Sequence, residues 1–244
     1  MKAIQKIVLT LTMIVLGGTL SFAQNYNNTS IQGNGIMTTR TAQTKGYDKI
    51  EVSGPISVTL VKGTEGTIEI TAESNVQERV VTESDGTTLI ISLKNNTSLL
   101  NTQKIKVKVP FKDLSAISLR GSGDVEGKDR VKASTLTLNL SGSGDIDLDI
   151  DADRLAAELS GSGEIELSGK VTNADIKSTG SGKFDCEKLV SDNAEITLSG
   201  SGDVKMVINK SLTGTIRGSG TIMYGGNPPT NKVDVRGSGK VKPF

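Results

Sequence analysis

The 244-residue chain contains no histidine and no tryptophan, and it has one cysteine, three tyrosines and four phenylalanines. Without histidine, the base that most often activates a serine nucleophile is missing. The single cysteine, Cys186, excludes an internal disulfide, so stability has to come from packing and backbone pairing. The shortage of aromatic side chains leaves few platforms for stacking on sugar rings.

An excess of charge of one sign is also missing. The chain has 28 basic and 27 acidic residues, a formal charge of +1, and these residues are interspersed along the sequence. Removal of an N-terminal segment that contains Lys2 and Lys6 would change this charge to −1. No basic surface is expected, so nucleic acid is not expected as a partner.

Long apolar runs are limited to the N-terminus. Lys2 and Lys6 precede an apolar run over 7–16, and the small-x-small sequence over 21–23 that follows is typical of a cleavage site. This pattern predicts a cleaved signal peptide over 1–23. The run is shorter than the ~20 residues that span a bilayer, so no membrane span is expected in the mature protein. We therefore expect an exported protein located in the periplasm, on the cell surface or outside the cell.

The mature chain changes character twice before its repeats begin. Residues 24–44 are rich in Asn, Thr and Gly without apolar periodicity, which predicts a flexible leader. In 45–112 apolar and polar residues alternate, as in Ile56, Val58 and Leu60, which is the period of a strand. Turn residues such as Asp85 and Gly86 separate these runs. The pattern predicts a β-hairpin-rich region that caps the N-terminal end of the repeats.

The remaining segment, 113–244, carries a repeat. The tripeptide Gly-Ser-Gly occurs seven times at successive spacings of 21, 19, 19, 20, 18 and 19 residues. Its copies begin at Gly121, Gly142, Gly161, Gly180, Gly200, Gly218 and Gly237. A near-constant period of this length is typical of stacked repeat proteins and not of a flexible linker.

Apolar residues surround each copy at alternate positions. Four residues after the first glycine stand Val125, Ile146, Ile165, Phe184, Val204, Ile222 and Val241. Two residues before it, only Ser178 interrupts a column of Leu, Ile and Val. Each repeat is therefore a strand, a glycine corner and a second strand. We predict an all-β fold, a right-handed parallel β-helix (solenoid) with about 19 residues per coil.

The same residues resemble a known family, the head GIN domain of autotransporter adhesins. The resemblance rests on Tyr47 to Gly54 (YDKIEVSG), on Asp85 to Ile91 (DGTTLII) and on Leu119 to Asp124 (LRGSGD). It implies a secreted or surface β-helical protein with a role in adhesion, and it supplies no catalytic residues. The family's autotransporter name implies a C-terminal membrane barrel, which we do not expect for this chain.

The repeated serines and glycines have a structural and a chemical interpretation. Seven serines without a neighbouring base are better explained as hydroxyls bonded to backbone at tight corners than as nucleophiles. The glycines resemble a phosphate loop, but such loops precede a helix and none is expected here. Glycine at a corner permits positive φ and leaves room for the adjacent coil. Cys186 follows Phe184 on the same strand face, so we expect it to point inward.

One row of side chains suggests a ligand. Asp124, Asp145 and Glu164 directly follow three successive corners, so stacking would place their carboxylates one strand spacing apart. The row is either a solvated corner or a weak calcium site, because hard cations prefer carboxylate oxygens. Carboxylates at such separations also suit polysaccharide cleavage, although a solenoid repeats acids in this way without any catalytic purpose.

The sequence thus predicts a non-catalytic secreted or cell-envelope protein with an adhesin-like binding or structural role. Catalytic residues and cofactors are not expected, apart from weak calcium binding at the acidic row. The partner is unknown, with a surface glycan or a matrix protein as candidates. The alternative is a polysaccharide-binding or polysaccharide-cleaving β-helix protein that uses the acidic row.

Overall fold

A computed structural model describes residues 29–244, which form one helix and nineteen strands. The predicted signal peptide over 1–23 lies outside the described residues. The helix is α1 (Ser74–Gln77). The strands are β1 (Thr29–Gln32), β2 (Met37–Gln43), β3 (Lys49–Ser53), β4 (Ile56–Lys62), β5 (Thr67–Glu73), β6 (Val80–Asp85), β7 (Thr88–Leu93), β8 (Thr97–Leu100), β9 (Ile105–Phe111), β10 (Ala116–Gly121), β11 (Asp124–Gly127), β12 (Val131–Gly142), β13 (Asp145–Gly161), β14 (Glu164–Gly180), β15 (Lys183–Gly200), β16 (Asp203–Gly218), β17 (Thr221–Gly225), β18 (Thr230–Gly237) and β19 (Lys240–Pro243).

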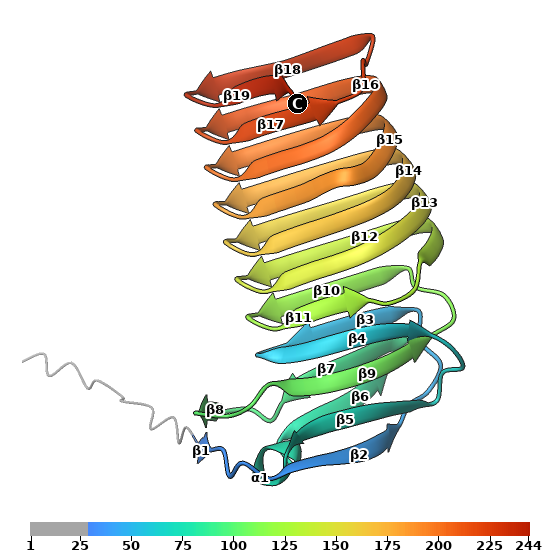
Figure 1. The fold of residues 1–244 in the computed structure, drawn as a ribbon, viewed down its shortest axis with the longest axis vertical. Coiled ribbons are helices and arrows are strands. Elements are labelled where there is room, and N and C mark those ends of the chain that lie inside the picture. The colour runs from blue at the N-terminus through green and yellow to red at the C-terminus, as the bar shows by residue number, and fades with distance from the viewer. Residues whose placement is uncertain (1–28) are drawn as a thin grey trace, which may run out of the picture.

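The repeats form the predicted β-solenoid, which is shown in Figure 1 as a stack of parallel coils. Each of β13 to β16 starts after one corner, bends around a rounded edge and ends at the next corner. Its two halves lie on opposite sides of the solenoid interior. We call the outer side of the strands that end at a corner the leading face, and the outer side of those that begin at one the trailing face. All pairings between successive coils are parallel.

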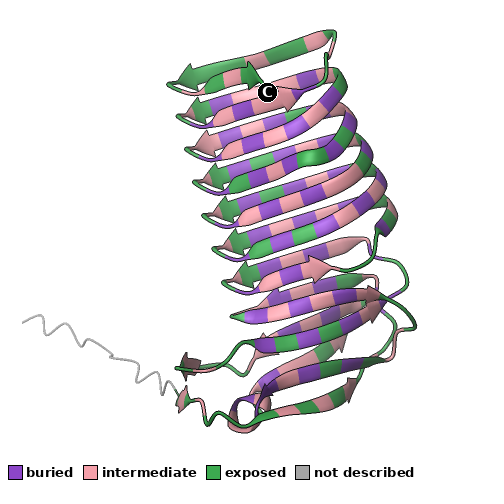
Figure 2. Cartoon of the chain, in the orientation of Figure 1, coloured by how far each residue is buried: buried purple, intermediate pink, exposed green. Residues whose placement is uncertain are grey.

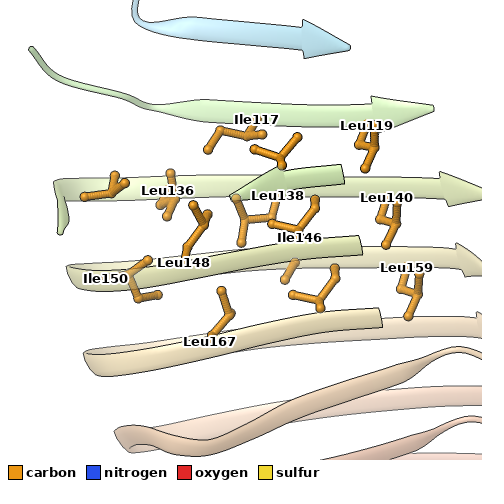
Figure 3. Close-up of a cluster of buried hydrophobic side chains, with 14 of the residues drawn as sticks. Ile117, Leu119, Leu136, Leu138, Leu140, Ile146, Leu148, Ile150, Leu159 and Leu167 are labelled. Atoms are coloured by element: carbon orange, nitrogen blue, oxygen red, sulfur yellow. The ribbon is translucent and has the colours of Figure 1, made fainter. Parts of the chain in front are cut away.

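The interior consists of columns of like residues. Leu119, Leu140 and Leu159 lie one above another, as Figure 3 shows, and each is at most 1% exposed. The predicted column from Val125 to Ile222 is buried throughout, and buried and accessible residues alternate along the strands (Figure 2). Val241, in the last coil, is only partly buried. Repeats this short cannot bury their own apolar sides, so the core exists only in the stack.

A side chain at either glycine of a corner such as 142–144 would overlap the adjacent coil, and the first glycine also has a backbone conformation that favours glycine. The first has positive φ in all seven copies, for example +130° at Gly142 and +128° at Gly161. The third residue of the corner, such as Gly144, lacks this conformation but has no space for a side chain. A Cβ atom on Gly144 would overlap the carbonyl oxygen of Gly123 in the adjacent coil. Backbone bonds join the corners, as from Ser143 N to the Gly121 oxygen at 2.9 Å.

The N-terminal region extends the solenoid before it caps it. β3 pairs in parallel with β10 and β4 with β11, so 49–62 already form one coil of the stack. β7 and β9 add parallel partners on the other side of β3 and β4. Beyond them the pairing becomes antiparallel, between β5 and β9 and between β2 and β5, and α1 packs against β5. The hairpin-rich cap and the repeats share one hydrophobic core.

The prediction of a flexible leader over 24–44 is wrong for 29–44, the part of it that the structure describes. β2 pairs with the whole of β5, and β1 pairs with β8. The reason is a buried carboxylate that sequence patterns do not reveal. Glu73 is 2% exposed and accepts backbone N–H bonds from Gly35 at 2.5 Å and from Gln103 at 2.9 Å. These bonds hold two loops against β5 although 24–44 has few apolar residues to bury.

Differences in coil length are accommodated on one side of the solenoid. The register shifts between β14 and β15 at Glu166 and Ser168, and between β15 and β16 from Cys186 to Val190 and from Ser191 to Asn193. The strands of the leading face keep an unbroken register from β12 through β18. Bulges therefore distort the trailing face and the rounded edge, and the leading face stays regular.

Candidate functional site

The predicted acidic row is in register on the trailing face. Asp124 pairs with Asp145, and Asp145 with Glu164. Lysine side chains form ion pairs with the acids at both ends of the row. Lys104 Nζ lies 3.1 Å from the Asp124 carboxylate, and Lys183 Nζ lies 3.0 Å from the Glu164 carboxylate. Asp145 accepts a bond from the Glu164 backbone N–H at 3.2 Å.

No group of three metal-ligating side chains occurs within residues 29–244. Weak calcium binding at the row therefore stays a prediction. A rise in melting temperature in 10 mM calcium, absent after Asp145→Asn, would establish it.

A second acidic column lies beside the first. It holds four consecutive acids in register, Glu126, Asp147, Glu166 and Asp185. Burial and the charges of Glu166 and Glu126 together raise the pKa of Asp147. This column was not among the sequence predictions. It could have been found, because an acid stands two positions after each member of the first row, at 126, 147 and 166.

Most charges of the trailing face are paired with one another. Ion pairs there join Lys104 to Asp124, Lys128 to Glu126, Lys170 to Asp151, Lys183 to Glu164 and Asp185, Lys188 to Glu166 and Lys205 to Glu187. Exposed pairs of this kind contribute little to stability, but they occupy the groups that a ligand would need. The trailing face is thus a poor candidate for a binding surface.

The leading face has the opposite character. Its outward positions are mostly Ser, Thr and Asn, with charges of both signs between them. Asn193 Nδ2 donates to Asn173 Oδ1 at 3.0 Å, and Lys177 contacts Asp175 at 3.4 Å. Many neighbouring polar side chains, Arg154 and Glu158 among them, have no side-chain hydrogen bond to any other described residue. The hydrogen-bonding capacity of this face is therefore largely open.

Three shallow depressions on the leading face form one connected groove. The first, of about 250 Å³, lies over β10, β12 and β13 and shares Asn139 and Glu158 with the second. The second, of about 130 Å³, shares Asp175 with the third, of about 230 Å³, which extends to Thr213. The groove runs diagonally from Arg120, next to the corner at the end of β10, to Ser211, near the rounded edge in β16. It was not predicted from the sequence, although the polar residues between the apolar columns were its signal.

The comparisons with known proteins agree with this architecture. Residues 46–228 match the family described as "Putative auto-transporter adhesin, head GIN domain". The chain belongs to this family. In a comparison with curated proteins, nothing matches this head GIN domain chain.

Solved structures share its fold. A "putative adhesin" from Bacteroides fragilis is 24% identical with a TM-score of 0.83, and the match covers 88% of this chain and 100% of that one. A "putative lipid binding protein" from Parabacteroides distasonis is 27% identical with a TM-score of 0.74 over the same shares. A "putative adhesin" from Parabacteroides merdae is 23% identical with a TM-score of 0.69, over 88% of this chain and 99% of that one.

The corner serines of the head GIN domain have a different role from the predicted one. The backbone N–H groups of five of them, Ser143, Ser162, Ser181, Ser201 and Ser219, bond to the preceding coil, as from Ser162 to the Gly142 oxygen at 2.9 Å. Their hydroxyls face solvent and have no hydrogen bond to another residue within 29–244. The prediction of hydroxyl-to-backbone bonding is therefore wrong, because the glycine conformation alone closes the corner. Next to them, Ser141, Ser160 and Thr179 form an exposed column in register at the groove's edge.

Cys186 and Asp48 have structural roles. Cys186 is fully buried, as predicted, and burial raises the pKa of its thiol. A hollow of about 650 Å³ lies where the β9–β10 connection meets the solenoid, and Asp48 and Lys132 line it. Ser115 Oγ donates to Asp48 at 2.6 Å, and this bond and one from Thr87 lower the pKa of Asp48. The carboxylate of Asp48 thus joins the segment before β3 to the β9–β10 connection, where the cap meets the solenoid.

Proposed function

We propose that this head GIN domain is a non-catalytic, adhesin-like binding protein of the cell envelope or cell surface, and that its leading face is the binding surface. The observation that carries the proposal is the contrast between the two faces. Most charged groups of the trailing face are held in ion pairs, whereas Arg154 and Glu158 of the leading face have no side-chain partner among the described residues. The amide pair of Asn193 and Asn173 on the leading face uses one donor and one acceptor and leaves the others available. The unbroken register of the leading strands adds a regular surface over several coils.

Family membership supports the adhesin part of this proposal, since the family carries that description. The pairing of Asp124 with Lys104 and of Glu164 with Lys183 supports the non-catalytic part, because a general acid or base needs a free carboxyl group. Lipid binding, the name given to one structural neighbour, is not favoured. Most residues that line the hollow at the β9–β10 connection are polar, such as Asp113, Lys132 and Ser134, and a lipid tail needs an apolar pocket. No described helix is long and apolar enough to cross a membrane.

A binding screen tests the proposal. The purified protein is applied to arrays of glycans and of extracellular matrix proteins, beside two variants. Asn139→Ala combined with Asn193→Ala removes two amides from the leading face, and Ser168→Ala changes an outward position of the trailing face. We expect a signal that the first variant loses and the second retains. No signal on either array, or equal signals from all three proteins, would refute the assignment of the binding face.

A further inference from the structure

The charges along the leading-face groove define the chemistry of its occupant. Six charged side chains line its three depressions. Arg120, Arg154 and Lys177 are basic, and Glu158, Asp175 and Glu195 are acidic. The fixed charge of the groove is therefore zero. A polyanion such as a nucleic acid or a sulfated glycan would meet three carboxylates, and a polycation would meet three basic groups.

The polar uncharged side chains of the groove are hydroxyls and amides, and its other uncharged lining residues are alanines and the buried Leu119 and Leu140. The hydroxyl and amide side chains are Ser118, Thr137, Asn139, Ser141, Ser160, Asn173, Asn193, Ser211 and Thr213. Each offers both a donor and an acceptor, so the groove suits a ligand with many groups of the same dual kind. Exposed apolar side chains of the kind that anchor protein interfaces do not line it.

The shape of the groove adds a second constraint. It crosses the leading strands from β10 to β16, which is a distance of about 24 Å along the stack at ~4.8 Å per strand. Its depressions are shallow and continuous, so no single deep pocket encloses one small molecule. The matching ligand is long and narrow, with polar groups along its whole length.

From this juxtaposition we infer that the groove binds an uncharged linear polysaccharide, laid diagonally across the leading strands. The inference rests on the proposed function and names its ligand class. Hydroxyls of successive sugars bond to the carboxylates of Glu158 and Glu195, which have no side-chain partner among the described residues. They also bond to the donors and acceptors that Asn139 and Asn193 have left after their bonds to Ser118 and Asn173. Hydrogen bonds to charged groups are the strongest of these, and Glu158 lies where the first two depressions meet.

Affinity electrophoresis in gels that contain one polysaccharide tests the inference. The probes are dextran, mannan and xyloglucan as uncharged polymers, heparin as a polyanion and chitosan as a polycation. We expect at least one uncharged polymer to retard the protein, and its affinity to stay within twofold between about 50 and about 500 mM NaCl. Retardation by heparin or chitosan alone, or affinity that salt abolishes, would overturn the inference.

Matched substitutions locate the binding. Glu158→Gln on the leading face should weaken binding to the uncharged polymer about tenfold. Glu166→Gln, the same change on the trailing face, should leave binding unchanged. Equal effects of the two variants, or no retardation by any uncharged polymer, would refute the ligand class. If the array screen then shows a protein ligand that depends on Asn139 and Asn193, the proposed function survives and only the ligand class fails.

Discussion

Ser178 offers the sharpest test of how the core packs, because its side chain lies where an apolar interior has no use for a hydroxyl. It is 3% exposed and stands between Leu159 and Leu198 in a column of apolar residues. Its Oγ has no hydrogen-bond partner within the described chain. An unsatisfied buried polar group costs about 1–3 kcal/mol. Ser178→Ala removes this group, and the small void it leaves costs less than the ~1 kcal/mol of a methyl-sized cavity.

The substitution should therefore stabilise the protein by about 1 kcal/mol, which for a domain of this size raises the melting temperature by about 2–4 °C. Thermal unfolding followed by circular dichroism measures the shift. Thr179→Ala is the control, because the neighbouring side chain is exposed and its removal should change little. A lower melting temperature for Ser178→Ala would show that the hydroxyl has a partner and would refute the reasoning.

Four further predictions concern stability in urea. Gly144→Ala should cost about 3 kcal/mol or more through overlap with the adjacent coil, while Ser143→Ala should change stability by less than about 0.5 kcal/mol; equal effects would contradict the corner geometry. Ile165→Asp should cost about 4 kcal/mol by burying an unpaired charge, and unchanged unfolding would reject the register. Because burial and neighbouring acids raise the pKa of Asp147, its contribution to stability is lost as pH rises through that pKa. Asp147→Asn should thus stabilise the protein at pH 7 and not near pH 3, and a gain that persists at low pH would exclude this cause. Glu73→Gln should cost about 2 kcal/mol by weakening its bonds to two backbone N–H groups, and a neutral result would show that they do not hold the loops.

Local patterns in the sequence were sufficient for the repeat and its interior. Residues such as Ile146 and Ile165 alternate with polar ones, and the period of the tripeptide places like positions above each other. Stacking follows from these two facts, because a coil of 19 residues cannot bury its own apolar side. The inward orientation of Cys186 followed from the same alternation. The family resemblance rested on equally local motifs.

The remaining features depend on partners far apart in the chain, which only folding brings together. Glu73 fixes the segment before β2 through residues 30 and 38 positions away. β3 and β4 join the stack beside strands that come more than 60 residues later. Both faces are rich in polar residues, and the sequence does not show which of these residues bond to each other. Asp124 forms an ion pair with Lys104 and Glu158 forms none within 29–244, because the fold brings a basic side chain close to the first and not to the second. Groups that the fold leaves unpaired, such as Glu158, are the ones most available to a ligand, and only the structure shows which they are.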